Sequence, residues 1–327
     1  MGLPELSIDP TEYLLGRPEP WVQYNARIKL LGRDPGDPEL DLVKQRLLRR
    51  DEISEIVAQC KGWPGAPLTR HNDARHLIHK ISFLADLGLG ISDPGIQEIV
   101  EKILQNRSEN GAIQSNILIP EHFGGTGKPR LDWMLCDAPT LLYSLLCFGL
   151  EGGPVGRAVD HLVSTVDDNG WRCRSSIPGM RGPGRKGDHC PYANLISLKA
   201  LSLVPDLVES EACKAGVEAQ LSHWENRSGR RIYMFGIGGT FAKLKYPNIW
   251  YDILHVVEVL SRFPYALEDD RFRELLGVVY DKQRGDGSFA AESVYRAWKG
   301  WSFGQKKESS PWLTCRIAMI DSRITGS

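Results

Sequence analysis

The sequence predicts an all-α protein of six helical hairpins that close into a ring. The first observation is a long repeat: Gly111, Gly170, Gly229 and Gly287 follow one another at intervals of 59, 59 and 58 residues, each in a polar turn after an apolar run. Self-similarity at a fixed long period indicates a repeat architecture. The second observation is that apolar residues recur at helical spacing, with little β-alternation. Each unit has room for two helices of about 12–14 residues and long connections.

Two series of predicted helices alternate along the chain. The more apolar series comprises residues 21–32, 72–88, 137–149, 192–204, 251–263 and 312–324. The more charged series lies at about 39–59, 94–105, 154–166, 209–224 and 269–283, with proline or paired aspartates near several starts, as helix N-termini favour. We expect the apolar series to form the inner wall, its N-terminal ends opening on a central cavity. The first and last helices are apolar, which favours a closed ring, because an open solenoid needs polar capping repeats.

Composition narrows the class of protein. We expect a single domain over residues 1–327, with residues 1–19 as an N-terminal extension and repeats of about 58–59 residues from about 20 to 324. The net charge of −1 argues against a nucleic-acid partner. Neither a signal peptide nor a transmembrane stretch is apparent. Because the seven cysteines are scattered, we expect a cytoplasmic protein whose thiols are free or metal-bound, without a disulfide-linked partner.

The turns after the charged helices carry a glutamine–glycine–aromatic pattern. They read Gln59-Cys-Lys-Gly62-Trp63, Gln283-Arg-Gly-Asp-Gly287-Ser-Phe289 and, in degenerate form, Asp168-Asn-Gly170-Trp171. These turns resemble the QW motif of the terpenoid cyclase and protein prenyltransferase superfamily, whose members are (α/α)6 toroids with inner and outer rings of helices. The resemblance covers nearly the whole chain from about residue 20. It implies an enzyme that acts on an isoprenoid or related apolar substrate in the central cavity.

A candidate metal site lies at the head of the fourth apolar helix, in Asp188-His189-Cys190. An acid and a thiolate two residues apart resemble the zinc motif of the prenyltransferase catalytic subunit, which a histidine from the next inner helix completes. The resemblance implies zinc held by Asp188, Cys190 and His255, with Asp252 and His189 as alternates. Zinc accepts all these ligand types, and a catalytic zinc keeps one position open. The alternative is structural: Asp188 caps a helix, Cys190 is a small buried apolar residue and His255 is a hydrogen-bonded core histidine.

Basic residues flank this motif. Arg181, Arg185 and Lys186 precede it in a segment rich in glycine and proline, Tyr192 follows it, and Lys245 precedes the next apolar helix. Prenyltransferases place an arginine, a lysine and a tyrosine in a similar way around the diphosphate of the isoprenoid donor. Arginine suits bidentate phosphate contacts and lysine suits neutralisation by a point charge. The resemblance therefore implies a diphosphate-binding basic loop, and the alternative is a solvated loop.

Asp137 is a candidate general acid. The stretch DWMLCDAPTLLYSLL lies where class II terpene cyclases carry a D-x-D-D motif, whose aspartic acid protonates an alkene or an epoxide. Burial alone makes a carboxyl a weaker acid, so a strong acid needs partner acids or a cationic neighbour. Asp132 lies too far along the chain to be assumed as that partner. Asp137 is therefore the acid of a cyclase-like enzyme, a helix cap or a ligand-binding group.

A histidine series precedes the second apolar helix. His76 and His79 are three residues apart and could suit a metal, with His71 and Asp73 close by in the chain. The alternative is a set of polar groups satisfied by hydrogen bonds in the core or the cavity wall.

Three functions remain open from the sequence. They are a prenyltransferase-like enzyme with zinc and a diphosphate-binding loop, a cyclase-like enzyme that uses Asp137, and a non-catalytic ring that holds a lipid or a peptide. Protein prenyltransferases work with a separate helical-repeat subunit, which this sequence does not encode. A protein partner is therefore unknown.

Overall fold

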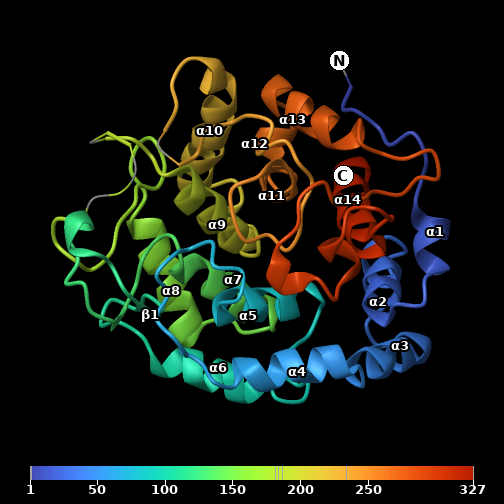
Figure 1. Ribbon diagram of the computed structural model, residues 1–327, viewed down its shortest axis with the longest axis horizontal. Helices are drawn as coiled ribbons and strands as arrows, with labels where there is room; N and C mark the ends of the chain where they lie inside the picture. The colour runs from blue at the N-terminus through green and yellow to red at the C-terminus, as the bar shows by residue number, and fades with distance from the viewer. Residues whose placement is uncertain (1, 181, 183, 186, 233, 327) are drawn as a thin grey trace. The chain divides into compact units, whose positions relative to one another are not determined.

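The computed structural model describes residues 2–180, 182, 184–185, 187–232 and 234–326. The chain forms two compact units. Unit 1 comprises Met1–Glu55, Gly238–Asn248 and Asp252–Ser327, and unit 2 comprises Ile56–Ile237 and Ile249–Tyr251. Both units are built mainly from helices (Figure 1), so the prediction of an all-α fold is confirmed. The prediction of a single domain stays a prediction.

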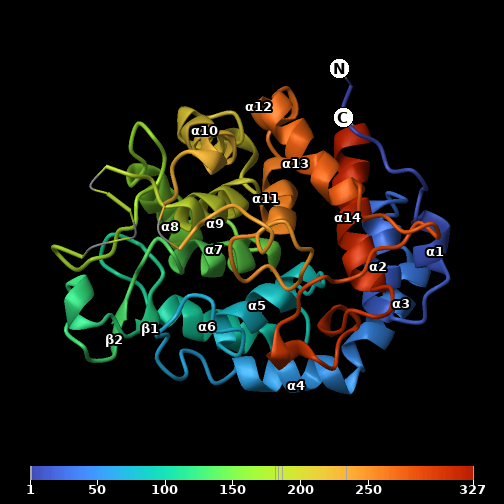
Figure 2. The same cartoon turned by 45° about the horizontal axis from the view of Figure 1, so that its top comes forward.

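Unit 2 contains three helical hairpins. Their helices are α5 (Leu77–Asp86), α6 (Ile96–Gln105), α7 (Ala138–Cys147), α8 (Gly153–Ser164), α9 (Pro191–Leu201) and α10 (Glu211–Glu225). Helix α7 packs against both α5 and α9, α8 packs against α7, and α10 packs against α9 (Figure 2). All eleven residues of α9 are buried, as expected for a helix that is surrounded on every side. Helices α6 and α8 bury only one face each.

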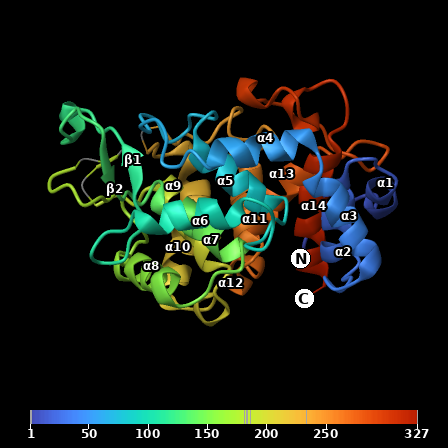
Figure 3. The ribbon, with the colours of Figure 1, turned by 90° about the horizontal axis from the view of Figure 1, so that it is seen from below.

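Unit 1 holds the first and last helices of the chain. Its helices are α1 (Thr11–Leu15), α2 (Pro20–Lys29), α3 (Pro38–Leu48), α11 (Ile253–Leu260), α12 (Pro264–Leu267), α13 (Asp270–Tyr280) and α14 (Pro311–Thr325). Helix α2 lies against α3 and α14 (Figure 3), and α11 packs against α13 and α14. The N-terminal segment is also docked in this unit: the Ile8 N–H donates to the Gln283 side chain, which donates back to the Ile8 carbonyl.

The helices agree with the predicted series, with three differences. The predicted helix 39–59 is two helices, α3 and α4 (Asp51–Cys60), because the Arg50 carbonyl accepts the first hydrogen bonds of a new helix. The predicted helix 72–88 begins only at Leu77, since His76 caps it. A short antiparallel pair, β1 (Ser115–Ile117) and β2 (Arg130–Asp132), was not predicted, because three-residue strands are too short to show alternation.

The helices of the structure can be compared with the length that a membrane span needs. Helices α10 and α14 have 15 residues each. Among the described residues, no helix combines the length and the apolar character that crossing a membrane requires.

In unit 2, a repeat turn fixes the start of α9. Gly170 has φ +91°, a left-handed conformation that favours glycine. The next residue, Trp171, donates its N–H to Asn194 Oδ1 of α9 (2.9 Å) and accepts from Asn194 Nδ2 (2.7 Å) and from the Cys190 N–H (2.8 Å). The turn after one outer helix is thereby tied to the first turn of the next apolar helix.

Unit 1 repeats this connection at α14. Gly287 has φ +79°. The Phe289 N–H donates to Thr314 Oγ1 (2.9 Å), and the Ser310 N–H donates to the Phe289 carbonyl (2.8 Å). At these two turns the repeat seen in the sequence is therefore also a repeat of hydrogen bonds, in which a glycine–aromatic turn sets the N-terminus of an apolar helix.

Candidate functional site

A buried acid and a histidine form a hydrogen-bonded pair at the N-terminal end of α7. His71 lies in the turn before α5, and Asp137 is the N-cap residue of α7. His71 Nδ1 is 2.8 Å from Asp137 Oδ1, so the ring N–H donates to the carboxylate. The Asp137 side chain is 2% exposed and the His71 side chain is 29% exposed. Asp137 Oδ2 is buried and has no hydrogen-bond partner in the described part of the chain. His71 is the cationic neighbour that the sequence had left unidentified.

The charge state of His71 follows from this pair. Burial lowers the pKa of His71, but attraction to Asp137 and the hydrogen bond between them outweigh that effect, so the pKa is raised. The imidazolium form is therefore favoured next to the carboxyl group.

Two further histidines hold the segment that carries His71. His79 Nε2 is 2.8 Å from the His71 carbonyl and donates to it, and His76 Nε2 is 3.0 Å from the Ala66 carbonyl. His76 Nδ1 also accepts from the Ile78 N–H at the start of α5. Burial lowers the pKa of His79 to about 4, so its ring is neutral at physiological pH. The structural interpretation of this histidine series is confirmed, because its polar groups are used in hydrogen bonds.

Three cysteines converge beside Asp137. Cys136 Sγ and Cys173 Sγ are 3.8 Å apart, and both thiols hydrogen-bond to Cys190. Cys190 is the N-cap residue of α9, and its Sγ accepts from the Ala193 N–H at 3.5 Å. The hydrogen bonds from Cys136 and Cys173, aided by backbone N–H groups and opposed by burial, hold the pKa of Cys190 well below its usual range. The same contacts and burial hold the pKa of Cys136 well above it.

The predicted zinc ligands of unit 2 face different partners. Arg230 Nη2 lies 2.5 and 2.6 Å from the two oxygens of Asp188, and the Arg185 N–H donates to Oδ2 at 2.6 Å. Burial raises the pKa of Asp188, but these donors outweigh it and lower the pKa overall. His189 lies edge-on to His223, with ring centroids 6.2 Å apart, and burial lowers its pKa to about 4. Both carboxylate oxygens of Asp188 therefore bind an arginine in this structure.

No metal site can be assigned from these residues. In the described ranges of the chain, no group of three or more His, Cys, Asp and Glu side chains is arranged to hold a metal ion. Asp188, His189 and Cys190 belong to unit 2, whereas Asp252 and His255 belong to unit 1. The zinc site that joins the two sets stays a prediction.

A basic pocket of about 540 Å³ borders Asp188. It is lined by Phe123, Gly182, Gly184, Arg185, Asp188, Gly229, Arg230 and Arg231. Arg185, which was predicted as an anion-binding residue, thus lines this pocket. Arg230 and Arg231 line it too, and they were not identified from the sequence. Arg181 and Lys186 lie outside the described residues.

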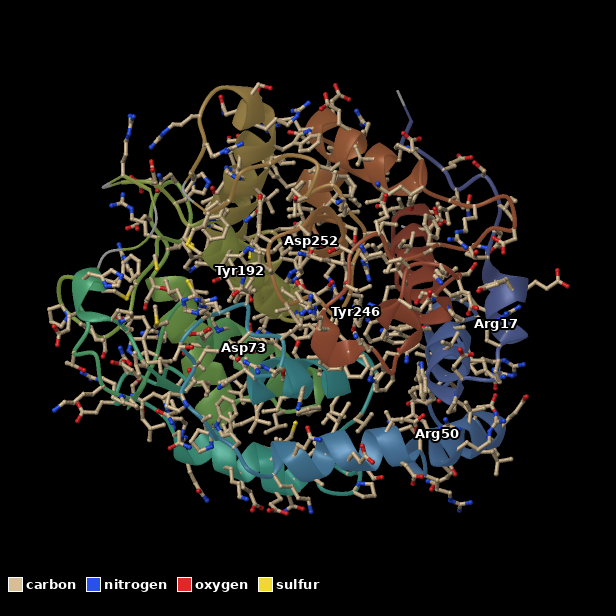
Figure 4. The ribbon with its side chains drawn as sticks, in the orientation of Figure 1. Arg17, Arg50, Asp73, Tyr192, Tyr246 and Asp252 are labelled. Carbon is tan, nitrogen blue, oxygen red and sulfur yellow. The ribbon has the colours of Figure 1, made fainter. Side chains whose placement is uncertain are left out.

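Tyr192 does not line this pocket. Its hydroxyl donates to the Ile249 carbonyl at 2.9 Å, and its ring packs on Trp250 with centroids 4.7 Å apart. The residue is buried on α9 (Figure 4), and burial holds its pKa well above the usual range. Because its hydroxyl is already used within unit 2, the structure gives Tyr192 a packing role and no contact with the basic pocket.

Unit 1 contains its own buried acid at the start of α11, Asp252 (Figure 4). Asp252 Oδ1 accepts from the His255 N–H at 3.1 Å, and Oδ2 lies 3.8 Å from Lys245 Nζ. Burial raises the pKa of Asp252 to about 7, although Lys245 opposes the change. Lys245 Nζ also lies 5.2 Å from the centre of the Tyr295 ring. Asp252 and Lys245, which the sequence assigned to separate sites, therefore form one pair.

Two functional candidates were missed because nothing local identifies them. His71 was noticed only as one of a histidine series, and its partner Asp137 is 66 residues away in the chain. Cys173 lies in the stretch WRCRS, which matches no ligand or nucleophile motif. A Cys–Asp pair at a helix start, in Cys136-Asp137, was the one signal that could have directed a search for further thiols.

Comparison with known proteins identifies similar structures but no family. No family model matches the chain, and no curated protein matches it. The apo type II terpene cyclase MstE from Scytonema is 12% identical, with a TM-score of 0.42, and the match covers 94% of this chain and 87% of that one. A protein from Actinoplanes is 13% identical, with a TM-score of 0.43 and coverage of 94% and 90%.

A variant of MstE in complex with geranylgeranyl dihydroxybenzoate, its substrate, is also similar. It is 13% identical with a TM-score of 0.41, and the match covers 93% of this chain and 86% of that one. Type II terpene cyclases belong to the superfamily that the sequence resembles. Similarity at this level assigns no activity, substrate or ligand to this chain.

Proposed function

We propose that this protein is an enzyme that transfers a proton from Asp137 to an apolar, isoprenoid-type substrate, in the manner of a class II terpene cyclase. The observation that supports the proposal is the buried Asp137–His71 pair, in which one carboxyl oxygen binds the imidazole and the other has no partner among the described residues. Residues with this combination of burial and a specific charged partner are frequent at active sites.

The pair suits an acid better than a base. The imidazolium of His71 donates to Oδ1 and stabilises the carboxylate that remains after a proton leaves Oδ2. In a buried site of low polarity, this stabilisation is larger than it would be in water. Protonation of an alkene or an epoxide needs such a donor, because the substrate is a poor base.

A second candidate function is prenyl transfer from a diphosphate donor. The basic pocket at Arg185, Arg230 and Arg231 supports it, because guanidinium groups bind phosphate oxygens well. The zinc that the family resemblance implies fits less well, since both oxygens of Asp188 are occupied by Arg230. Asp188 would have to exchange that guanidinium for a metal ion.

The two functions are tested by incubating the protein with polyprenes that carry a terminal alkene or epoxide, and separately with prenyl diphosphates. For proton-initiated cyclisation of an alkene, a reaction in D₂O must place one solvent deuterium in each cyclic product. Asp137→Asn should lower turnover by about 100-fold or more, whereas the exposed Asp168→Asn should leave it unchanged. Cyclic alkene products without deuterium, or full activity in Asp137→Asn, would refute the proposal. Chelator-sensitive diphosphate release would support the second candidate instead.

A further inference from the structure

The cysteine cluster has a feature that the proposed function does not use. Cys136 lies in the turn that leads into α7, Cys173 lies in a bend, and an isolated antiparallel bridge joins the chain next to both. Met134 and Ser175 form an isolated antiparallel bridge, and the Leu135 N–H donates to the Arg174 carbonyl at 2.9 Å.

Cys136 lies two residues after Met134 and Cys173 lies two residues before Ser175, so the bridge brings the two cysteines close together within unit 2. The observed Sγ–Sγ distance of 3.8 Å shows that the two side chains already point at each other. For a bond to form, the two sulfur atoms must approach one another from this distance to about 2.05 Å.

We propose that Cys136 and Cys173 form a redox-active dithiol that reacts with a hydroperoxide. One of the two thiols passes its proton to the neighbouring Cys190 thiolate, and its sulfur then takes one oxygen atom from the peroxide. The proton returns to the hydroxide that leaves, which gives a sulfenic acid and, from hydrogen peroxide, one water molecule. The sulfur of the second cysteine attacks the sulfenic sulfur, a disulfide bond forms, and a second water molecule leaves. Two thiols are oxidised by two electrons in total, and the peroxide is reduced.

Three other thiols have no such neighbour among the described residues. Cys60, Cys213 and Cys315 are buried and, in the described part of the chain, form no contact with another cysteine. Cys173 is half-buried, so a small peroxide reaches the cluster from its side. Cys190 hydrogen-bonds to both partners, and its sulfur accepts from the Ala193 N–H at the start of α9.

The disulfide would also act on the proposed proton donor. Cys136 immediately precedes Asp137, and a bond to Cys173 would restrain the start of α7. The expected consequence, which rests on the proposed function, is that oxidation lowers turnover and a dithiol reductant restores it. Disulfide formation itself is independent of that function.

The test uses the full reduced chain, treated with hydrogen peroxide and then mapped by mass spectrometry without reduction. We expect two of the seven thiols to be lost and a cross-link between Cys136 and Cys173 to appear. A cross-link between other cysteines, a link between two chains, or the retention of all seven thiols would overturn the proposal. Because Cys147 lies on the same tryptic peptide as Cys136, fragmentation must assign the sulfur.

Cysteine variants give a second test that does not depend on the peptide map. Cys136→Ala and Cys173→Ala should each abolish the paired loss of thiols, while Cys213→Ala, which removes a buried cysteine outside the cluster, should preserve it. An unchanged rate of paired thiol loss in Cys136→Ala would refute the assignment. If either cluster variant fails to fold, the peptide map of the unmodified chain still decides. A cross-linked chain with unchanged turnover on a proven substrate would refute only the link to Asp137.

Discussion

Replacing Asp252 with asparagine should make the protein more stable at neutral and alkaline pH. Asparagine keeps an oxygen that can accept from the His255 N–H at the start of α11, so the helix cap is preserved. It removes the ionisable group, whose charged form is penalised because the side chain is fully buried. The change thus isolates the cost of burying a carboxylate.

The magnitude follows from the pKa of Asp252. Its ordinary value of 3.8 rises to about 7 in the folded protein, so the folded state binds a proton more tightly than the unfolded state. Stability therefore falls as the pH rises from about 4 to about 7, where the unfolded chain is ionised and the folded chain is not. Each pKa unit corresponds to about 1.4 kcal/mol, so the loss is at most about 4 kcal/mol. Lys245, whose partner would become neutral, reduces the gain.

The assay is urea-induced unfolding between pH 4 and pH 8, and it compares Asp252→Asn with the unmodified chain. We expect the advantage of the variant to increase with pH. Asp269, another aspartate N-cap, is the matched control, because Arg271 lowers the pKa of Asp269. Its stabilising effect is present above the ordinary pKa of 3.8 and is lost only as the pH falls below that value, so the cost of Asp269→Asn should stay nearly constant between pH 4 and pH 8. A pH-independent difference for Asp252→Asn would refute the reasoning.

Two other predictions concern unit 2. Asn194→Ala should lower the free energy of unfolding by about 3 kcal/mol, because the Trp171 N–H loses its acceptor inside the core. The exposed Asn169→Ala should lower it by at most about 0.5 kcal/mol. Equal losses for the two variants, measured by urea unfolding, would contradict this account. His71→Gln should destabilise the protein more at pH 5 than at pH 9. Because pairing with Asp137 raises the pKa of His71, its stabilising effect is complete below the ordinary pKa of 6.5 and is lost as the pH rises through the folded value. Equal destabilisation at both pH values, measured by thermal unfolding, would exclude the ion pair.

Helix positions could be read from the sequence because they are encoded locally. Helices α7, α9 and α14 begin within one residue of their predicted starts, since each apolar run follows a glycine–aromatic turn or a polar N-cap. The break between α3 and α4 was missed, because apolar spacing continues across it while Arg50 starts a new set of hydrogen bonds. The spacing of apolar residues indicates which side chains are buried, but it does not indicate where one helix ends and the next begins.

The site was less predictable, because contacts between repeats decide it. The resemblance to the prenyltransferase zinc motif implied that Asp188 and Cys190 bind one metal ion, and that site stays a prediction. In the structure, Asp188 lies in a turn and binds Arg230, whereas Cys190 caps α9 and contacts two other thiols. The hydrogen bond between His71 and Asp137 could not be predicted, because the sequence does not show which turn lies beside α7.

The N-caps of the apolar helices give the strongest reason to regard Asp137 as functional. In four such helices, α5, α9, α11 and α14, the side chain of the N-cap residue accepts a hydrogen bond from a backbone N–H of the same helix; these residues are His76, Cys190, Asp252 and Ser310. The N-cap residue of α2, Glu19, makes no such bond. In α7 the Asp137 side chain makes no such bond, although aspartate is a favoured cap worth about 1 kcal/mol. Its carboxyl group instead binds His71 and leaves one buried oxygen without a partner in the described residues. A structural acid at this position would cap its helix; an acid turned away from it, toward an imidazole, is oriented for proton transfer.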